Sequence, residues 1–424
     1  MLLLPTRRLW RLYRSWIRLA TFLLLIVLSI DFLLTISLTP PRARVSTSST
    51  SSDDVIRKDR IFVASMHWNN ERIIRSHWSA AMLDLVRHFG ADNVYISIIE
   101  SGSWDDTKGA LRDLDVELDK LGVERSIEIL ESTHKDEVER IPEPSEEGWV
   151  WTSKGRKELR RIPYLAKLRN RVMEKLKQLA ERTDGQGKRS FDKILWLNDV
   201  IFTTEDVVTL IATRDGNYAA ACAVDFSNPP LFYDTFALRD ISGEKPITQT
   251  WPFFLAAESR NAMKSSSPVP VQSCWNGIVV FDADPFYQNP PLRFRGIPDS
   301  LALHHLEGSE CCLIHADNSL SLTRGVWLNP NVRVSYNPKA DNVVNPKGGR
   351  WPSKREMLKG IWSNRWARWT RFPWRYTERF VVERRVRLWR NQVQQTGHAE
   401  VHEEGIHCLI NEMQVLVENG WAHV

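Results

Sequence analysis

The sequence lacks the short motifs that mark several large classes of α/β protein. It has no Walker-A lysine loop and no G-x-G-x-x-G segment after its first predicted strand, which argues against P-loop NTPases and nicotinamide-dependent enzymes. The five cysteines show no C-x-x-C spacing and no zinc pattern, and their odd number leaves at least one thiol free. No Asn-x-Ser/Thr acceptor occurs. The composition, 42% hydrophobic and 26% charged residues over 424 positions, is typical of a globular protein with a real core.

One long apolar run lies near the N-terminus. Residues 19–38 can cross a hydrocarbon core of about 30 Å as a helix that rises about 1.5 Å per residue. Arginines crowd residues 1–18, which predicts a cytoplasmic tail and a translocated body. A cleaved signal peptide is the alternative, but its apolar core is normally shorter, and a small-residue cleavage site is missing here. Asp31 would cost about 2.5–3.5 kcal/mol at mid-membrane, so we expect it to be a tolerated single charge or to face a partner.

The rest of the chain divides into three predicted segments. Residues 39–60, rich in Ser, Thr and Pro, have the composition of a flexible stem. Residues 61–336 are the predicted folded domain, and residues 337–424 form a basic extension rich in Trp and Arg. This plan is that of a single-pass type II protein of a Golgi or other secretory-pathway membrane, with its body in the lumen. The extension is interpreted as packing onto the body, with contact to the membrane surface as the alternative; nucleic-acid binding does not suit a lumenal body.

Strand-like and helix-like segments alternate along the body. Short apolar strands are expected at residues 61–65, 94–99 and 127–130, with helical patterns between them. Further strands are expected within 191–202, 218–225, 273–281 and 332–336. This alternation predicts an α/β fold, Rossmann-like, with a mostly parallel sheet flanked by helices.

Residues 191–202 are the centre of the functional prediction. The apolar strand ends in Asn198 and Asp199, and a helix start with acidic residues follows at 203–206. Ligands of open α/β sheets lie at the carboxyl ends of strands, so we expect Asp199 to point into a cleft and hold Mg²⁺ or Mn²⁺ against a phosphate. The alternative is that Asn198 and Asp199 only close a turn. With nucleotide triphosphate and nicotinamide motifs absent, a nucleotide-sugar is the remaining common ligand.

Six ordered motifs carry a resemblance to a known family. They are H-W-N-N-E at 67–71, E-S-G-S-W-D-D-T at 100–107, R-I-P-Y-L-A-K-L-R-N at 161–170, L-N-D-V at 197–200, W-N-G at 275–277 and S-E-C-C-L-I-H at 309–315. In these segments the chain resembles the fungal capsule-associated α-1,3-mannosyltransferase family, that is, the cryptococcal-type mannosyltransferases. The resemblance implies a type-A glycosyltransferase fold, GDP-mannose as donor, a mannan-type glycan as acceptor, and dependence on Mn²⁺ or Mg²⁺.

Site roles can be proposed beside that resemblance. Asp199 would hold the metal; the usual D-x-D is Asn198-Asp199-Val200 here, so Asp225 or His315 would have to complete the metal site. A satisfied core histidine is the alternative for His315. The donor-binding candidates are His67, Asn70, Glu71, Glu100, Asp105, Arg161, Lys167, Arg169 and Asn198. For the three basic residues of this set, a solvated helix face is the alternative.

The transfer chemistry itself has three candidate carboxylates. Glu310 is expected nearest the anomeric carbon or the acceptor hydroxyl, and Asp225 and Asp234 compete for that role. Trp275 and Asn276 are expected to bind a sugar ring, unless they are ordinary core residues.

The cysteines predict a disulfide, and the fold allows a second functional hypothesis. The adjacent pair Cys311 and Cys312 cannot readily bridge to each other, so a disulfide from one of them to Cys274 or Cys222 is expected. A non-catalytic glycan-binding or polysaccharide-export factor on the same fold is the second functional hypothesis.

Overall fold

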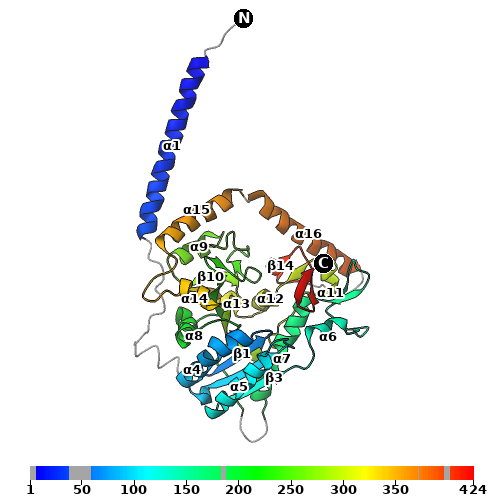
Figure 1. Ribbon diagram of the computed structural model, residues 1–424. Coiled ribbons are helices and arrows are strands. Elements are labelled where there is room, and N and C mark those ends of the chain that lie inside the picture. Colours follow the sequence, from blue (N-terminus) through cyan, green and yellow to red (C-terminus); the bar gives the residue numbers. More distant parts are fainter. Residues whose placement is uncertain (1–5, 38–58, 183–187, 371, 396–401) are drawn as a thin grey trace.

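The computed structural model describes residues 6–37, 59–182, 188–370, 372–395 and 402–424. Almost all of the predicted stem lies outside these ranges. The body is built on a ten-stranded sheet in the order β3-β2-β1-β6-β11-β7-β13-β10-β9, with β8 paired to β7 (Figure 1). The strands are β1 (Ile61–His67), β2 (Val94–Glu100), β3 (Glu124–Ile129), β6 (Lys193–Leu197), β7 (Ala220–Asn228), β8 (Leu231–Phe232), β9 (Arg239–Asp240), β10 (Val269–Ser273), β11 (Ile278–Asp282) and β13 (Val326–Ser335).

The two halves of the sheet differ in direction. Strands β3, β2, β1 and β6 are all parallel, as the sequence predicts for this part. Strand β11 is antiparallel to β6 and β7, whereas β13 is parallel to β7 and antiparallel to β10. The sheet is therefore parallel in its N-terminal half and mixed in the other.

Helices cover both faces of the sheet because the strands are apolar on both sides. Ile61 and Val63 pack with α4 (Ser79–Phe89), α5 (Thr107–Lys120) and α8 (Thr204–Ile211). Phe62 and Ala64 point to the other face and pack with α7 (Arg161–Ala180), which carries the predicted basic motif. Further helices are α3 (Glu71–Ile73), α6 (His134–Glu139), α9 (Ala257–Lys264), α10 (Asp284–Tyr287), α11 (Asp299–Ala302), α12 (Glu310–Ala316), α13 (Ser321–Arg324) and α14 (Pro338–Val344).

The strand expected at 273–281 is in fact two strands with a turn between them. β10 ends at Ser273 and β11 begins at Ile278. Asn276 and Gly277 have φ angles of 47° and 84°, a left-handed conformation that ends an extended strand. A Cβ atom at Gly277 would lie 2.7 Å from the Val334 side chain, so both the turn and its surroundings require glycine there.

The C-terminal extension packs onto the body, as the favoured interpretation expects. It contains α15 (Lys354–Thr370), α16 (Phe372–Gln395) and the short strands β14 (Leu409–Ile410), β15 (Gln414–Val417) and β16 (Gly420–His423). Strand β14 pairs with β12 (Glu307–Gly308), just before α12, and β15 pairs with β16. A separate small hairpin joins β4 (Trp149–Trp151) and β5 (Lys157–Leu159). Residues from α11, α12, α16 and β14 share one apolar cluster, so the extension is part of the folded body.

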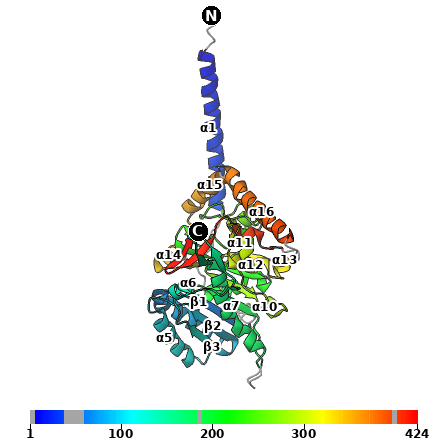
Figure 2. The ribbon, with the colours of Figure 1, turned by 90° about the vertical axis from the view of Figure 1, so that its right-hand side faces the viewer.

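A single long helix, α1 (Thr6–Ser37), leaves the body at the end where α15 lies (Figure 2). Its segment Tyr13–Leu34 has a mean hydropathy of 2.3 and only 6% of its most apolar window is buried. This segment fits a single-pass membrane anchor and overlaps the predicted span 19–38.

Candidate active site

Three strand ends and one strand start meet at the same edge of the sheet. His67 ends β1 opposite Glu100, which ends β2. Leu197 ends β6 and lies opposite Ile278, the first residue of β11. Polar residues adjoining these positions are therefore gathered at one edge, where open α/β sheets bind ligands.

Asn198 and Asp199 follow β6 and have different environments. Asn198 Oδ1 accepts the indole N–H of Trp275 at 2.9 Å, and its carbonyl accepts that of Trp78 at 3.0 Å. Asp199 is partly buried, and its Oδ2 accepts Nδ2–H of Asn70 at 2.9 Å. Burial raises the pKa of Asp199 from 3.8 to about 6, although the bond from Asn70 favours the ionised form. Asn198 thus fixes the turn, and Asp199 carries a carboxyl group whose pKa burial raises to about 6.

A second carboxyl group, Asp225 of β7, is fully buried nearby. Its Oδ1 accepts Nδ2–H of Asn276 at 2.9 Å and the backbone N–H of Asp234 at 3.2 Å. Its Oδ2 accepts the hydroxyl of Tyr336 at 3.1 Å. Burial, and then the charge of Asp234, raise the pKa of Asp225. Tyr336, the residue that follows β13, therefore orients the carboxyl group of Asp225.

Asp234 and Asn276 are held close to Asp225 by their own backbone contacts. Asp234 Oδ1 accepts the backbone N–H groups of Phe236 and Ala237 at 3.0 and 3.1 Å. Burial raises the pKa of Asp234, and the charge of Glu310 acts in the same direction. Asn276 also donates to the Asp234 carbonyl at 3.2 Å, while its Oδ1 is buried without a hydrogen-bond partner among the described residues. That amide oxygen is an unused acceptor beside two carboxyl groups.

Glu310 lies at the start of α12 and is ion-paired inside the protein. Its Oε1 accepts Nε–H of Arg169 from α7 at 3.1 Å, and both side chains are buried. The Arg169 guanidinium also lies 4.3 Å from the centre of the Trp275 ring. Trp275 itself is only 2% exposed and belongs to the core, so its ring is not a surface platform for a sugar.

The loops after β1 and β2 are hydrogen bonded to each other. Asn70 accepts from His67 Nδ1 at 3.2 Å while donating to Asp199, so it links the first loop to the metal candidate. Asp105 accepts the backbone N–H of Glu71 at 3.1 Å. Glu100, which is fully buried, accepts the backbone N–H of Ser103 at 2.5 Å. Burial lowers the pKa of His67 to about 4, so its ring is neutral.

Other predicted site residues lie elsewhere. His315 is buried: its Nε2–H donates to the Cys274 carbonyl at 2.6 Å and its ring stacks on Phe281. No described contact joins it to Asp199, so it matches its core alternative. Lys167 is exposed, and on helix α7 it lies about 200° around from Arg169. Arg161 donates to Gln414 of the extension at 2.6 Å.

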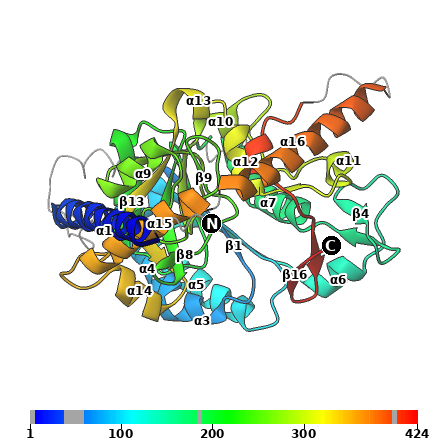
Figure 3. The ribbon, with the colours of Figure 1, turned by 90° about the horizontal axis from the view of Figure 1, so that it is seen from above.

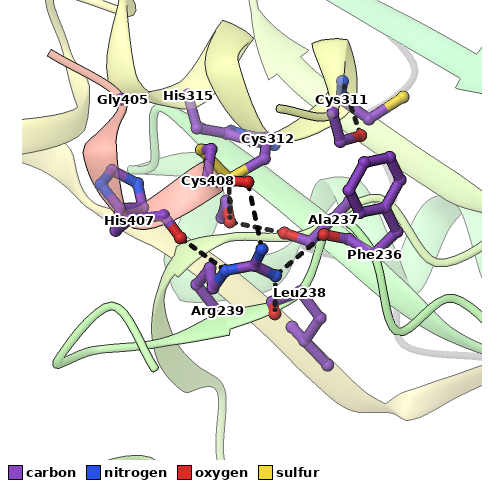
Figure 4. Close-up of a disulfide and its surroundings, with 12 residues drawn as sticks. Phe236, Ala237, Leu238, Arg239, Cys311, Cys312, His315, Gly405, His407 and Cys408 are labelled. Atoms are coloured by element: carbon purple, nitrogen blue, oxygen red, sulfur yellow. Dashed lines mark hydrogen bonds between the residues drawn. A yellow bond between two sulfur atoms is a disulfide. The ribbon is translucent and has the colours of Figure 1, made fainter. Parts of the chain in front are cut away.

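The disulfides differ from the expected pairing. Cys222 bonds Cys274. Cys312 bonds Cys408, and Cys311 is the free, buried thiol (Figure 4). The predicted pairing was wrong because Cys408 of the extension lies next to α12 in the folded protein.

The two groups of His and Cys close enough to hold a metal both consist of a disulfide and one histidine, so neither is a metal site in the described chain. A cavity of about 810 Å³ lies beside α16, and its lining does not include Asp199, Asp225, Asp234 or Glu310.

The sequence profile of the family described as cryptococcal mannosyltransferase 1 matches residues 60–317, more than half of the chain. The chain belongs to this family. It is 26% identical over 283 residues to the alpha-1,3-mannosyltransferase of Cryptococcus neoformans, covering 63% of the present chain and 56% of that relative. The chain thus spans about half the length of the relative it matches.

Two solved structures are also similar to this member of the cryptococcal mannosyltransferase family. The mannosyltransferase of Pyrobaculum calidifontis in complex with GDP-Man and Mn²⁺ is 12% identical, with 82% of each chain covered and a TM-score of 0.35. TarS 1–349 of S. aureus is 13% identical, with 66% of the present chain and 59% of that chain covered and a TM-score of 0.32. The predicted α/β fold, with a mostly parallel sheet flanked by helices, is confirmed.

The site of this family member has the chemistry that a hard divalent cation requires. Asp225 accepts the backbone N–H of Asp234, the charge of Glu310 acts on Asp234, and the buried Arg169 is ion-paired with Glu310. The raised pKa values of the three aspartates show that ionising them is costly without added positive charge. Carboxylate and amide oxygens are the ligands that Mg²⁺ and Mn²⁺ prefer. Asp199 is therefore the first candidate ligand by the chemistry of its oxygens, although the described carboxylates form no group of three ligand atoms within 4.8 Å of one another.

Proposed function

We propose that the chain is a membrane-anchored mannosyltransferase that moves mannose from GDP-mannose to a mannose-containing glycan, forming an α-1,3 linkage for capsule or cell-wall polysaccharide. The observation that carries this proposal is Asp199 at the tip of β6, half-buried and held by Asn70, in a chain of this family. The relative of Cryptococcus neoformans is itself an alpha-1,3-mannosyltransferase.

The proposed roles follow from the contacts. Asp199 would hold Mn²⁺ or Mg²⁺, which neutralises the charge of the leaving diphosphate when bound. Asn70 orients Asp199, and Tyr336 orients Asp225. A carboxyl group whose pKa is raised toward neutrality can accept the proton of the acceptor hydroxyl, which makes Asp225 the first candidate base, with Asp234 and Glu310 beside it.

The proposed placement is a secretory-pathway membrane, Golgi or another, with residues 1–18 cytoplasmic and the body in the lumen. Helix α1 provides the anchor, and arginines precede its apolar span. Two disulfides in the body suit an oxidising compartment. In this plan residues 39–60 are the stem, 61–336 the catalytic domain and 337–424 an extension that completes it.

The test is transfer by the purified full chain with GDP-mannose, Mn²⁺ and a mannose or mannobiose acceptor. Asp199→Ala should abolish transfer, whereas Asp84→Ala, at an exposed position on α4, should leave it unchanged. The non-catalytic alternative is favoured by one observation, that Asn198-Asp199-Val200 lacks the second carboxylate of D-x-D. No transfer by the wild type, with glycan binding equal in the wild type and Asp199→Ala, would establish that alternative.

A further inference from the structure

An ion pair connects the membrane helix to the C-terminal extension. Arg365 of α15 donates to both carboxylate oxygens of Asp31 in α1, with Nη2 at 3.0 Å from Oδ1. Asp31 is only 9% exposed, whereas its neighbours on α1 are about half exposed or more. The acidic residue that a transmembrane span tolerates poorly thus has a charged partner from the body.

This ion pair fixes the level of α15 relative to the apolar span. Asp31 lies three residues before Leu34, the end of the span, which corresponds to about 4.5 Å along the helix axis. A side chain that bonds Asp31 must therefore lie within about one helical turn of the membrane boundary. Figures 1 and 2 agree, because α15 and α16 form the end of the body from which α1 leaves.

Helix α15 presents two different faces. Gly360, Asn364 and Ala367 are buried, and Asn364 donates to the Phe254 carbonyl at 3.1 Å. A Cβ atom at Gly360 would lie 1.8 Å from the Trp251 carbonyl oxygen, so this face packs closely on the body. Residues two positions after these buried ones lie about 200° further around the helix, and therefore form its opposite face.

That opposite face carries tryptophans and basic residues. Trp362, Trp366 and Trp369 are spaced four and three residues apart, and therefore share one side of α15. Trp366 is 65% exposed and Trp369 is 62% exposed. Arg355 and Lys359, also exposed, extend the same stripe toward the start of the helix. The outer side of α16 continues this composition with Phe380, Arg384 and Leu388, and Figure 3 shows both helices lying across this end of the body.

We propose that the outer face of α15 lies against the phospholipid headgroups on the body's side of the membrane. The indole rings of Trp366 and Trp369 occupy the interfacial region, and Arg355 and Lys359 bind lipid phosphates. The Asp31–Arg365 ion pair sets the height of the helix. The body then rests on the bilayer, whereas a stem alone would hold it away. This proposal rests on the proposed membrane anchor and does not depend on the transfer reaction.

Collision depth measurements test the proposal in the full chain, reconstituted in phosphatidylcholine vesicles containing phosphatidylserine. Nitroxide labels are placed by Trp366→Cys and Trp369→Cys, with matched controls at other exposed tryptophans, Trp104→Cys and Trp421→Cys. The wild-type chain, treated with the same nitroxide reagent, gives the background signal, because its free thiol, Cys311, is buried. The ratio of oxygen to water-soluble nickel-complex collisions should be several-fold higher at 366 and 369 than at 104 and 421. Thermal midpoints confirm that each variant is folded.

A label from Leu24→Cys, in the middle of the apolar span, separates the possible failures. A high oxygen-to-nickel collision ratio at position 24, together with low ratios at positions 366 and 369, would overturn the proposed surface contact while leaving the anchor intact. A low oxygen-to-nickel collision ratio at position 24 would overturn the anchor itself. In an Asp31→Asn background the label at 369 should become more accessible to nickel; an unchanged ratio would show that the ion pair does not set the height.

Discussion

Asparagine in place of Asp199 should stabilise the protein above neutral pH when divalent cations are removed. Burial raises the pKa of Asp199 to about 6, whereas the same carboxyl group titrates at 3.8 in the unfolded chain. The folded protein binds this proton more tightly than the unfolded chain does. The resulting stabilisation of the folded state is complete below pH 3.8 and is lost as the pH rises through about 6. At about 1.36 kcal/mol for each tenfold change in proton affinity, the ionised Asp199 costs about 3 kcal/mol at pH 8.

The assay compares thermal midpoints of the full chain in mild detergent with EDTA. For a body of this size, about 3 kcal/mol corresponds to a rise of about 4 °C for Asp199→Asn at pH 8. At pH 4 the difference should fall below about 1 kcal/mol. Asp84→Asn, exposed on α4, is the matched control and should change neither midpoint. Added Mn²⁺ should reverse the order at pH 8, because only the wild type keeps the proposed ligand.

One result would refute the reasoning. If Asp199→Asn lowers the midpoint at pH 8 in EDTA, the ionised carboxylate is stabilised by its surroundings, and burial does not govern its titration. The hydrogen bond from Asn70 would then outweigh desolvation.

Three further predictions concern the surrounding contacts. Arg169→Met should lower stability by about 3–5 kcal/mol by leaving Glu310 buried without its partner, and adding Glu310→Gln should restore part of that loss in thermal melts; no restoration would contradict the ion pair. Tyr336→Phe should cost about 1 kcal/mol of stability while lowering kcat about tenfold, because Asp225 loses the donor that orients it; unchanged transfer would remove Tyr336 from the site. Cys408→Ser, which opens a disulfide across 96 residues, should cost about 4–5 kcal/mol, and wild type and variant should melt alike once both are fully reduced, because Cys222–Cys274 is then open in each; a remaining difference would point to a role of the thiol itself.

The sheet edge was predictable because its signals are local. Apolar runs that end in polar residues located β1, β2 and β6, and so placed His67, Glu100 and Asp199 at one edge. Tyr336 was missed as a site residue although it ends the last predicted strand; the same strand-end rule would have identified it.

Contacts between distant segments could not be read from the sequence. Trp275 looks like a sugar platform in the linear chain, but folding places it beneath Arg169, a residue from another helix. His315 looks like a metal ligand until the structure packs it between Phe281 and Cys274. The partner of Asp31, likewise, lies 334 residues further along the chain.

The pairing of Cys312 with Cys408 sets an order for biosynthesis. Cys408 leaves the ribosome 96 residues after Cys312, so in the proposed lumenal topology Cys312 enters the lumen before the thiol it must join. During that interval it shares the compartment with Cys222, Cys274 and Cys311, each able to form an incorrect bridge. A bridge of that kind has to be exchanged once Cys408 arrives, so the yield of active protein should follow the supply of disulfide isomerase.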